Sequence, residues 1–174
     1  MFTRPSLFRG TVLALLCVTA LSAFAGPKTK EPAPRFNART LDGEKFNNES
    51  VKGKVVLLEF WTPWCVYCFE EAGFVDQIKK EFRDMGLIVL AVNVAESKKT
   101  VKKYLDQHPR TSRIVLTDDT NLAAMYEAVE YPIYVVIDKN GNISATQRGA
   151  AGEAALRDML ADAGIGPKDE PEPK

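Results

Sequence analysis

The chain has 174 residues, a length that suits a single domain, and 45% of its residues are hydrophobic. Its 23 lysine and arginine residues balance 23 aspartate and glutamate residues. Because the sequence has no strongly basic stretch, these features argue against a nucleic-acid-binding protein.

The first 25 residues have the features of an export signal. Arg4 and Arg9 supply positive charge, residues 11–21 are apolar, and Ala23-Phe24-Ala25 has the small side chains that a signal peptidase recognises. We therefore expect cleavage after Ala25 and a periplasmic location for the mature protein. The alternative is an uncleaved membrane anchor, because residues 10–26 carry no charge, although a bilayer span needs about 20 apolar residues.

Removal of residues 1–25 would leave only two cysteines, Cys65 and Cys68. A disulfide between them would close a very short loop. Such a loop constrains little of the unfolded chain, because the stabilising effect of a disulfide grows with loop length. A chemical role explains this pair better than a structural one.

Two short segments are predicted to flank the folded domain. Residues 26–34 contain three prolines and three charged residues, which is typical of a flexible spacer. Residues 166–174 contain three prolines and five charged residues, which is typical of a disordered tail. The domain itself is expected over residues 35–165.

The first half of the domain is predicted to contain a hairpin, a buried strand and a long helix. Residues 36–46 form two short strand patterns around the turn Asp42-Gly43. Residues 55–60 form an apolar run that only Glu59 interrupts, as expected of a central strand buried on both faces. A helix is predicted over residues 65–85, and Gly86 would end it.

The second half continues this alternation of strands and helices, which predicts an α/β fold with a mixed central sheet flanked by helices. Thr120 is a suitable helix N-cap, and Asn140-Gly141 favours an antiparallel hairpin at one side of the sheet. In chain order, the predicted elements are a strand at 87–94, a helix at 98–108, a strand at 114–116, a helix at 120–129, strands at 133–138 and 143–147, and a helix at 153–163.

The spacing of the two cysteines suits redox chemistry. In the first turn of a helix, side chains three residues apart lie on one side, about 5–6 Å from each other, a separation compatible with a disulfide. Cys65 would lie at the helix N-terminus, where unpaired amide groups and the helix dipole stabilise a thiolate. We expect Cys65 to attack and Cys68, one turn further on, to resolve the mixed disulfide.

Other uses of this motif fit the residues poorly. A c-type haem requires histidine directly after the second cysteine, where the chain has Phe69. A structural zinc site requires four ligands, and two cysteines with the single His108 cannot supply them. No metal and no bound cofactor are therefore expected.

Several segments together resemble the thioredoxin-like superfamily, and in particular the TlpA/ResA branch of exported thiol–disulfide oxidoreductases. They are VVLLEFWTPWCVYCFEE at 55–71, KGK at 52–54, LDG at 41–43, and VEYP at 129–132 followed by IYVVID and KNGN. The resemblance covers about residues 34–164. It implies a thioredoxin-like fold with an N-terminal β-hairpin extension and a helical insertion, and an activity on protein disulfides outside the cytoplasm.

The resemblance also implies which residues contact a substrate. Pro132 would follow a cis peptide bond and pack against the cysteine pair, and the backbone of Tyr131 would bond an extended substrate segment. Tyr131 is larger than the residue usual at this position, so the range of substrates would differ. Trp64 would offer a flat apolar surface beside the cysteines.

The dipeptide Val66-Tyr67 between the cysteines bears on the direction of electron flow. It lacks the histidine typical of strong oxidants and the proline typical of reductants. Without a nearby cation, the extra stabilisation of the thiolate would be modest, and a well-stabilised reduced form is what makes an oxidant. The sequence therefore favours a reductant or isomerase.

Two carboxylates are candidates for proton transfer. Glu59 occupies a position where thioredoxin-like proteins often hold a buried acid; burial favours the protonated form of a carboxyl group, and Glu59 could accept the proton of Cys68. The alternative interpretation is that this end of the strand is open to water and that Glu59 is merely solvated.

Glu71 is the second candidate. It matches a glutamate near the cysteines in the TlpA/ResA branch, and it heads the apolar stripe of the predicted helix. The alternative interpretation is that Glu71 is a partly exposed carboxylate whose negative charge complements the positive end of the helix dipole.

Two rival functions remain open. Thr62 lies three residues before Cys65, as in the PxxxTxxC motif of peroxiredoxin-like thiol peroxidases, but Leu58 replaces the proline of that motif. A non-enzymatic thioredoxin-fold binding module is the second rival.

The expected partners are a protein disulfide substrate and a membrane-embedded electron donor. The chain is expected to be a monomer that contacts the membrane only if its N-terminal segment is uncleaved.

Overall fold

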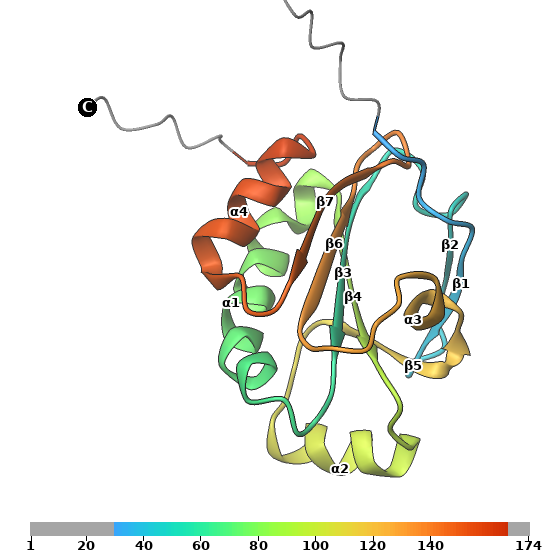
Figure 1. The fold of residues 1–174 in the computed structure, drawn as a ribbon, viewed down its shortest axis with the longest axis vertical. Coiled ribbons are helices and arrows are strands. Elements are labelled where there is room, and N and C mark those ends of the chain that lie inside the picture. Colours follow the sequence, from blue (N-terminus) through green and yellow to red (C-terminus); the bar gives the residue numbers. More distant parts are fainter. Residues whose placement is uncertain (1–29, 167–174) are drawn as a thin grey trace, which may run out of the picture.

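The computed structural model describes residues 30–166, which fold around one seven-stranded sheet (Figure 1). The strands are β1 (Asn37–Thr40), β2 (Lys45–Asn47), β3 (Val55–Trp61), β4 (Leu87–Asn93), β5 (Arg113–Thr120), β6 (Ile133–Ile137) and β7 (Ile143–Arg148). The helices are α1 (Val66–Phe82), which continues into a 3-10 turn, η1 (Arg83–Met85), then α2 (Lys98–Gln107), α3 (Leu122–Met125) and α4 (Gly152–Asp162).

The sheet is mixed, as predicted. Its order is β2-β1-β5-β4-β3-β6-β7. Strands β3, β4 and β5 are parallel, and β6 runs antiparallel to both β3 and β7. The N-terminal hairpin β1–β2 extends the other edge, because β1 pairs antiparallel with β5. Strand β3 is therefore central, and all seven of its residues are buried.

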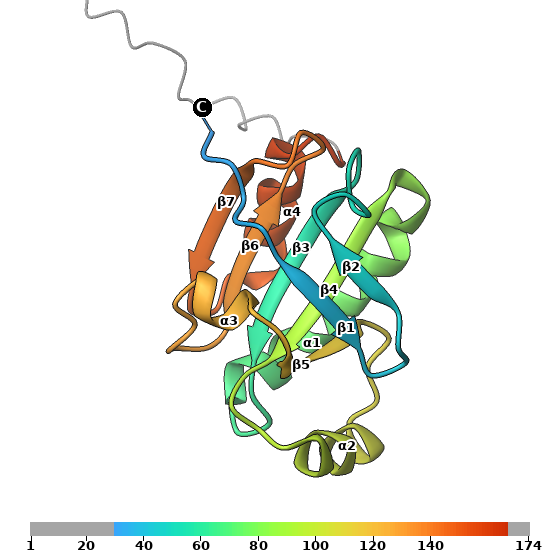
Figure 2. The ribbon, with the colours of Figure 1, turned by 90° about the vertical axis from the view of Figure 1, so that its right-hand side faces the viewer.

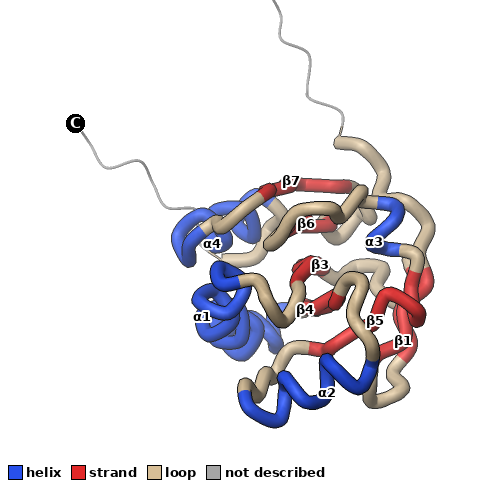
Figure 3. Tube along the Cα trace, turned by 60° about the horizontal axis from the view of Figure 1, so that its bottom comes forward, coloured by secondary structure: helices blue, strands red, loops and turns tan. Residues whose placement is uncertain are grey.

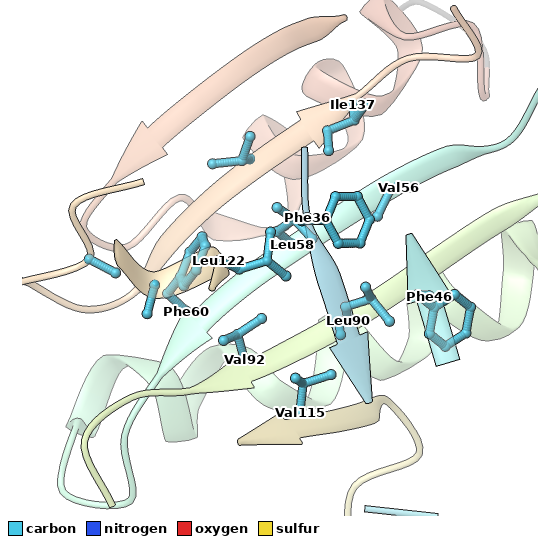
Figure 4. Packing of buried hydrophobic residues seen from close by; sticks show 14 of the residues in the cluster. Phe36, Phe46, Val56, Leu58, Phe60, Leu90, Val92, Val115, Leu122 and Ile137 are labelled. Carbon is cyan, nitrogen blue, oxygen red and sulfur yellow. The ribbon is translucent and has the colours of Figure 1, made fainter. Parts of the chain in front are cut away.

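Helices cover the two faces of the sheet unequally. In Figure 1, α1 and α4 lie on one face, while α3 and the N-terminal hairpin lie on the other. Figure 2 shows the hairpin in front of the central strands, and Figure 4 shows Phe36 and Phe46 packed over Val56 and Leu90 in that core. Because side chains alternate along a strand, Glu59 of β3 belongs to the opposite face, under α1.

Three elements differ from the sequence expectation in their length. Strand β5 continues to Thr120 because it pairs with β1 as well as with β4. Helix α3 has only four residues, and Thr120 accepts a bond from Leu122 just before it. The chain leaves the helix at Glu127, whose φ of 48° is left-handed. Helix α1 tightens into the 3-10 turn before Gly86, which has a φ of 89°.

Part of the predicted spacer belongs to the folded domain. The carbonyl of Glu31 accepts a hydrogen bond from the amide of Ile143 (2.7 Å), and the amide of Ala33 donates to Gly141 (2.9 Å). Lys30 forms an ion pair with Asp138 at 3.0 Å. The fold thus begins before residue 35, because these backbone groups bond the β6–β7 turn.

The predicted signal segment 1–25, residues 26–29 of the spacer and residues 167–174 of the tail lie outside the described residues. Within residues 30–166, no helix has both the length and the apolar character needed to cross a bilayer.

Candidate active site

The cysteine pair lies where β3 passes into α1. Figure 3 brings this end of the molecule forward, together with α2. Cys65 is the N-cap residue of α1, with an extended backbone (φ −81°, ψ 107°), and its sulfur accepts a hydrogen bond from the amide of Cys68 at 3.1 Å. The first turn of the helix contains no acidic residue. The sulfur of Cys65 therefore occupies the position at which a helix stabilises negative charge.

Cys65 and Cys68 form a disulfide, and their Cα atoms are 5.2 Å apart. The residue exposure is 7% for Cys65 and 2% for Cys68. The order of accessibility is the one expected from the sequence, because the second cysteine is one turn inside the helix. An attacking thiol of a partner would reach Cys65 first.

Large apolar side chains surround the pair on the surface. Trp64, Val66 and Tyr67 are all more than half exposed. The ring of Trp64 meets the ring of Tyr131 edge-on, with their centroids 5.6 Å apart. Exposed apolar groups at this density mark a binding surface more often than a random face of a monomer.

The loop before β6 closes the other side of the pair. The peptide bond between Tyr131 and Pro132 is cis. Tyr131 packs against the cluster that contains both cysteines, and its hydroxyl donates to the carbonyl of Ala128 at 3.0 Å. The carbonyl of Pro132 accepts from Gly149 at 2.8 Å. The structure thus brings Trp64, Tyr131 and the cysteine pair together, as the sequence predicted.

Glu59 is fully buried, but it is not a lone acid. The guanidinium of Arg110 donates to both carboxylate oxygens, at 3.0 and 2.6 Å. The side-chain exposures are 0% for Glu59 and 3% for Arg110, so the whole ion pair is inside the protein. Burial opposes the charge of Arg110, but attraction and hydrogen bonding to Glu59 outweigh it and raise the pKa of the guanidinium.

Arg110 is the functional candidate that sequence reasoning missed. It follows α2 in the loop that leads to β5, 51 positions from Glu59 along the chain. Its guanidinium also covers the ring of Trp61 at 5.5 Å. No periodic pattern identifies such a residue; the only available signal was a buried acid that would require a partner. The alternative interpretation of Glu59 as a solvated residue at a strand end is therefore wrong.

Glu71 is also buried, with an exposure of 5%. One of its oxygens accepts from the hydroxyl of Tyr134 at 2.7 Å, and the other accepts from the amide of Gly152 at 2.7 Å. The carboxylate thereby joins α1 to β6 and to the start of α4. The alternative interpretation of Glu71 as a partly exposed carboxylate is therefore wrong, because these two donors hold its side chain between α1, β6 and the start of α4.

Tyr134 lies between the two carboxylates. It is the direct neighbour of Glu59 in the β3–β6 register, and it donates to Glu71. Burial raises the pKa of Tyr134, and the nearby charge of Glu59 and the bond to Glu71 raise it further. The hydroxyl is therefore held in its protonated, donating form.

The apolar stripe predicted for α1 is buried except at its end. Val75, Ile78 and Phe82 are buried, while Met85 is 51% exposed. The change to a 3-10 turn at Arg83 alters the angular spacing of side chains, and Met85 leaves the stripe for this reason.

A surface hollow of about 290 Å³ adjoins the disulfide, and Cys65 is part of its wall. Its lining consists of residues 63–66 together with Phe69, Tyr104 and His108. A larger hollow of about 560 Å³ lies along α1 and contains no cysteine. Among residues 30–166, no group of three or more histidine, cysteine, aspartate or glutamate side chains could hold a metal ion.

The mixed sheet, the disulfide at a helix N-cap and the cysteine spacing define a thioredoxin-like protein with a cysteine pair at the start of a helix. The chain belongs to the AhpC/TSA family, whose model matches residues 29–146. It is 33% identical over 138 residues to the thioredoxin-like protein YneN of Bacillus subtilis, covering 78% of this chain and 80% of that protein. It is 27% identical over 158 residues to the thiol-disulfide oxidoreductase ResA of the same species, covering 87% and 88%.

Solved structures show the same fold. A thiol:disulfide interchange protein of the thioredoxin family from Chlorobium tepidum superposes with a TM-score of 0.67 at 25% identity, over 77% of this chain and 96% of that one. The exposed lipoprotein thioredoxin of Streptococcus pneumoniae superposes with a TM-score of 0.65 at 26% identity, over 74% and 99%. Together with the bonded pair at the helix start, these likenesses make the chain an enzyme of the thiol–disulfide oxidoreductase class.

Proposed function

We propose that the protein reduces or isomerises disulfides of other proteins outside the cytoplasm, through Cys65 and Cys68. The observation that carries this proposal is the disulfide at the N-cap of α1, with Cys65 in the wall of a surface hollow. A substrate sulfur can reach Cys65 there, while Cys68 stays within bonding distance of Cys65 but away from the substrate.

The reaction begins with the reduced enzyme. The Cys65 thiolate attacks one sulfur of the substrate disulfide, and the other substrate sulfur leaves as a thiolate that takes up a proton. Cys68 then loses its proton and attacks Cys65 in the mixed disulfide. The products are the enzyme disulfide and two substrate thiols, so two electrons pass from enzyme to substrate.

The helix start activates Cys65. In the disulfide, its sulfur already faces the amide of Cys68. In the reduced enzyme the same amide would donate to the thiolate, and no acid in the first turn would oppose the negative charge. Alkylation rates of the reduced enzyme measured against pH should therefore show a pKa below about 8 for Cys65, whereas a free cysteine has a pKa of about 8.5.

We assign proton transfer from Cys68 to Glu71 first and to Glu59 second. Glu71 lies three residues from Cys68 on the buried side of α1, where such side chains are neighbours. Its partners are neutral donors, whereas Glu59 is held by a bidentate arginine. The charge-assisted, bidentate bonds from Arg110 are stronger than bonds from neutral donors, so we assign Glu59 mainly to balancing the charge of Arg110.

The substrate segment would lie across the surface around the cysteines. Trp64, Val66 and Tyr67 offer apolar contacts, and the backbone of Tyr131 before Pro132 would bond an extended chain. The signal-like residues 1–25 support an extracytoplasmic location, where disulfides persist. A dithiol donor, held by a membrane-embedded protein, would then return two electrons to the enzyme. We propose a monomer.

A glutathione-buffered titration tests the proposal. We expect a reversible two-electron couple between about −120 and −300 mV, with a stable mixed disulfide accumulating in Cys68→Ser and none in Cys65→Ser. A reductant should lie near the lower end of that range, at about −270 mV, and an isomerase should lie higher, at about −180 mV. If no couple appears in this range, the cysteines are not a redox pair and the fold serves only binding.

Peroxide consumption separates this function from that of a thiol peroxidase. We expect the wild type to consume peroxide no faster than Cys65→Ser. Rapid consumption that depends on Cys65 would instead assign the enzyme to the peroxidases.

A further inference from the structure

The hollow beside the disulfide has a wall that comes from α2. Tyr104 lies on α2 and His108 caps its end. Their rings are 4.7 Å apart, and His108 meets Phe69 of α1 edge-on at 5.1 Å. Two helices that are separate in sequence thus build one aromatic surface next to Cys65.

This wall is fixed to the core of the protein. The ring of Tyr104 contacts the ring of Trp61 at 5.4 Å, and Trp61 has an exposure of only 1%. Val101 of α2 is fully buried in the same cluster as both cysteines. A wall anchored in this way is formed before a ligand arrives, which lowers the entropic cost of binding.

The chemistry of the lining restricts what can enter. None of its residues is aspartate, glutamate, lysine or arginine. Apart from the imidazole of His108, the lining offers a charged group no counter-ion in exchange for the water it would lose, which is unfavourable. An apolar group would gain contact with the rings and with the side chain of Val66, which is 66% exposed.

We propose that this hollow is a specificity subsite for one large apolar side chain that flanks the reacting cysteine of the substrate protein. This inference rests on the proposed function, because Cys65 itself is one of the residues that line the hollow. A volume of about 290 Å³ is at the lower limit of small-molecule sites and suits a single side chain. Helix α2 thereby contributes to the selection of substrates.

Two disulfide-bonded peptides provide the test. They are identical except for the residue next to the attacked cysteine, which is leucine in one and aspartate in the other. The second-order rate constant is measured in a single turnover with prereduced enzyme, so no electron donor is required. We expect the wild type to react about tenfold faster with the leucine peptide, the ratio that about 1.4 kcal/mol produces.

The variant Phe69→Ser removes one wall of the hollow, and its ratio of the two rates should fall to about one. Met85→Ser is the matched control, because Met85 is a similarly exposed apolar residue in the 3-10 turn at the far end of α1; it should keep the tenfold ratio. Thermal unfolding verifies that both variants are folded.

Equal rates for both peptides in the wild type, or an unchanged ratio in Phe69→Ser, would overturn the subsite and leave the proposed function intact. Failure of the folded wild type to reduce either peptide would overturn the proposed function, and the subsite with it.

Discussion

Glu59 and Glu71 occupy the same buried layer between α1 and the sheet, yet their surroundings differ in kind. Glu59 is matched by a full positive charge on Arg110. Glu71 is matched by two neutral donors, the hydroxyl of Tyr134 and the amide of Gly152. Burial alone therefore does not decide what an acid beneath a cysteine pair does; the charge of its partner decides it.

The ion pair is the unusual member of this comparison. Removing two charges from water is expensive, and such pairs are seldom more stabilising than well-packed apolar residues. The pair is also close to the chemistry, because Arg110 covers Trp61 and Trp61 packs with both cysteines. We expect it to hold the charge beneath the disulfide near zero.

The largest expected effect is on stability. Arg110→Leu or Glu59→Leu alone leaves one buried charge without its partner and should lower the free energy of unfolding by about 3–5 kcal/mol. The double variant removes both charges and should unfold within about 1 kcal/mol of the wild type or above it. Denaturant titration of the three variants measures this. Additive losses in the double variant would show that the two side chains do not act as a pair.

The same pair makes a prediction about the redox potential. Glu59→Gln leaves the guanidinium uncompensated, and this cation should stabilise the thiolates of the reduced enzyme and raise the potential by on the order of 30 mV. In Arg110→Gln the free carboxylate either repels the thiolates or takes up a proton, so the potential should fall or stay constant. The glutathione titration used above measures both variants.

A purely structural role would not produce this asymmetry. Arg110→Lys retains the charge and is the control, with a potential close to that of the wild type. Shifts of the same sign in Glu59→Gln and Arg110→Gln would contradict the assignment of an electrostatic role to the pair.

The fold and the cysteine geometry could be predicted because they depend on local patterns. The apolar run of β3 and the periodicity of α1 can be recognised in short stretches of the sequence. Once the start of the helix is known, the three-residue spacing of Cys65 and Cys68 places their side chains within reach of each other. The length of β5 was underestimated because its second half pairs with the distant strand β1.

The partners of the two acids could not be predicted for the same reason. Arg110 is 51 positions from Glu59, and Tyr134 is 63 positions from Glu71. Neither contact leaves a periodic trace in the sequence, and an arginine in a loop resembles any surface arginine. The sequence could indicate that Glu59 needed a partner, but only the packing of the loop after α2 supplies it.

A smaller effect is expected at Glu71. Glu71→Gln keeps the shape of the side chain but removes the acceptor charge, and it should lower the free energy of unfolding by about 1–3 kcal/mol, since at least one buried donor loses its preferred acceptor. If Glu71 accepts the proton of Cys68, the resolving step should also slow, while the first attack by Cys65 should not. Stopped-flow decay of a preformed mixed disulfide measures the resolving step.

Glu70→Gln is the matched control, because Glu70 is the adjacent, exposed glutamate of the same helix. It should change neither the stability nor the decay of the mixed disulfide. A decay in Glu71→Gln as fast as that of the wild type would remove Glu71 from proton transfer and leave it a structural acceptor.

The smallest expected effect is confined to alkaline pH and comes from Tyr134. Burial raises the pKa of this hydroxyl, with further contributions from Glu59 and from the bond to Glu71. The unfolded chain ionises the same tyrosine near pH 10, so the unfolded state releases its proton first. The contribution of Tyr134 to stability is therefore complete below about pH 10 and declines as the pH rises above that value.

Denaturant titrations at pH 8 and pH 11 measure this effect. Between these two pH values, the free energy of unfolding should fall less in Tyr134→Phe than in the wild type, because phenylalanine has no proton to release. Tyr126, whose pKa burial raises to about 12, is present in both proteins, so its contribution cancels. An equal loss in the two proteins would mean that the hydroxyl of Tyr134 is reached by water, and that Glu71 is less isolated from solvent than its contacts with Tyr134 and Gly152 imply.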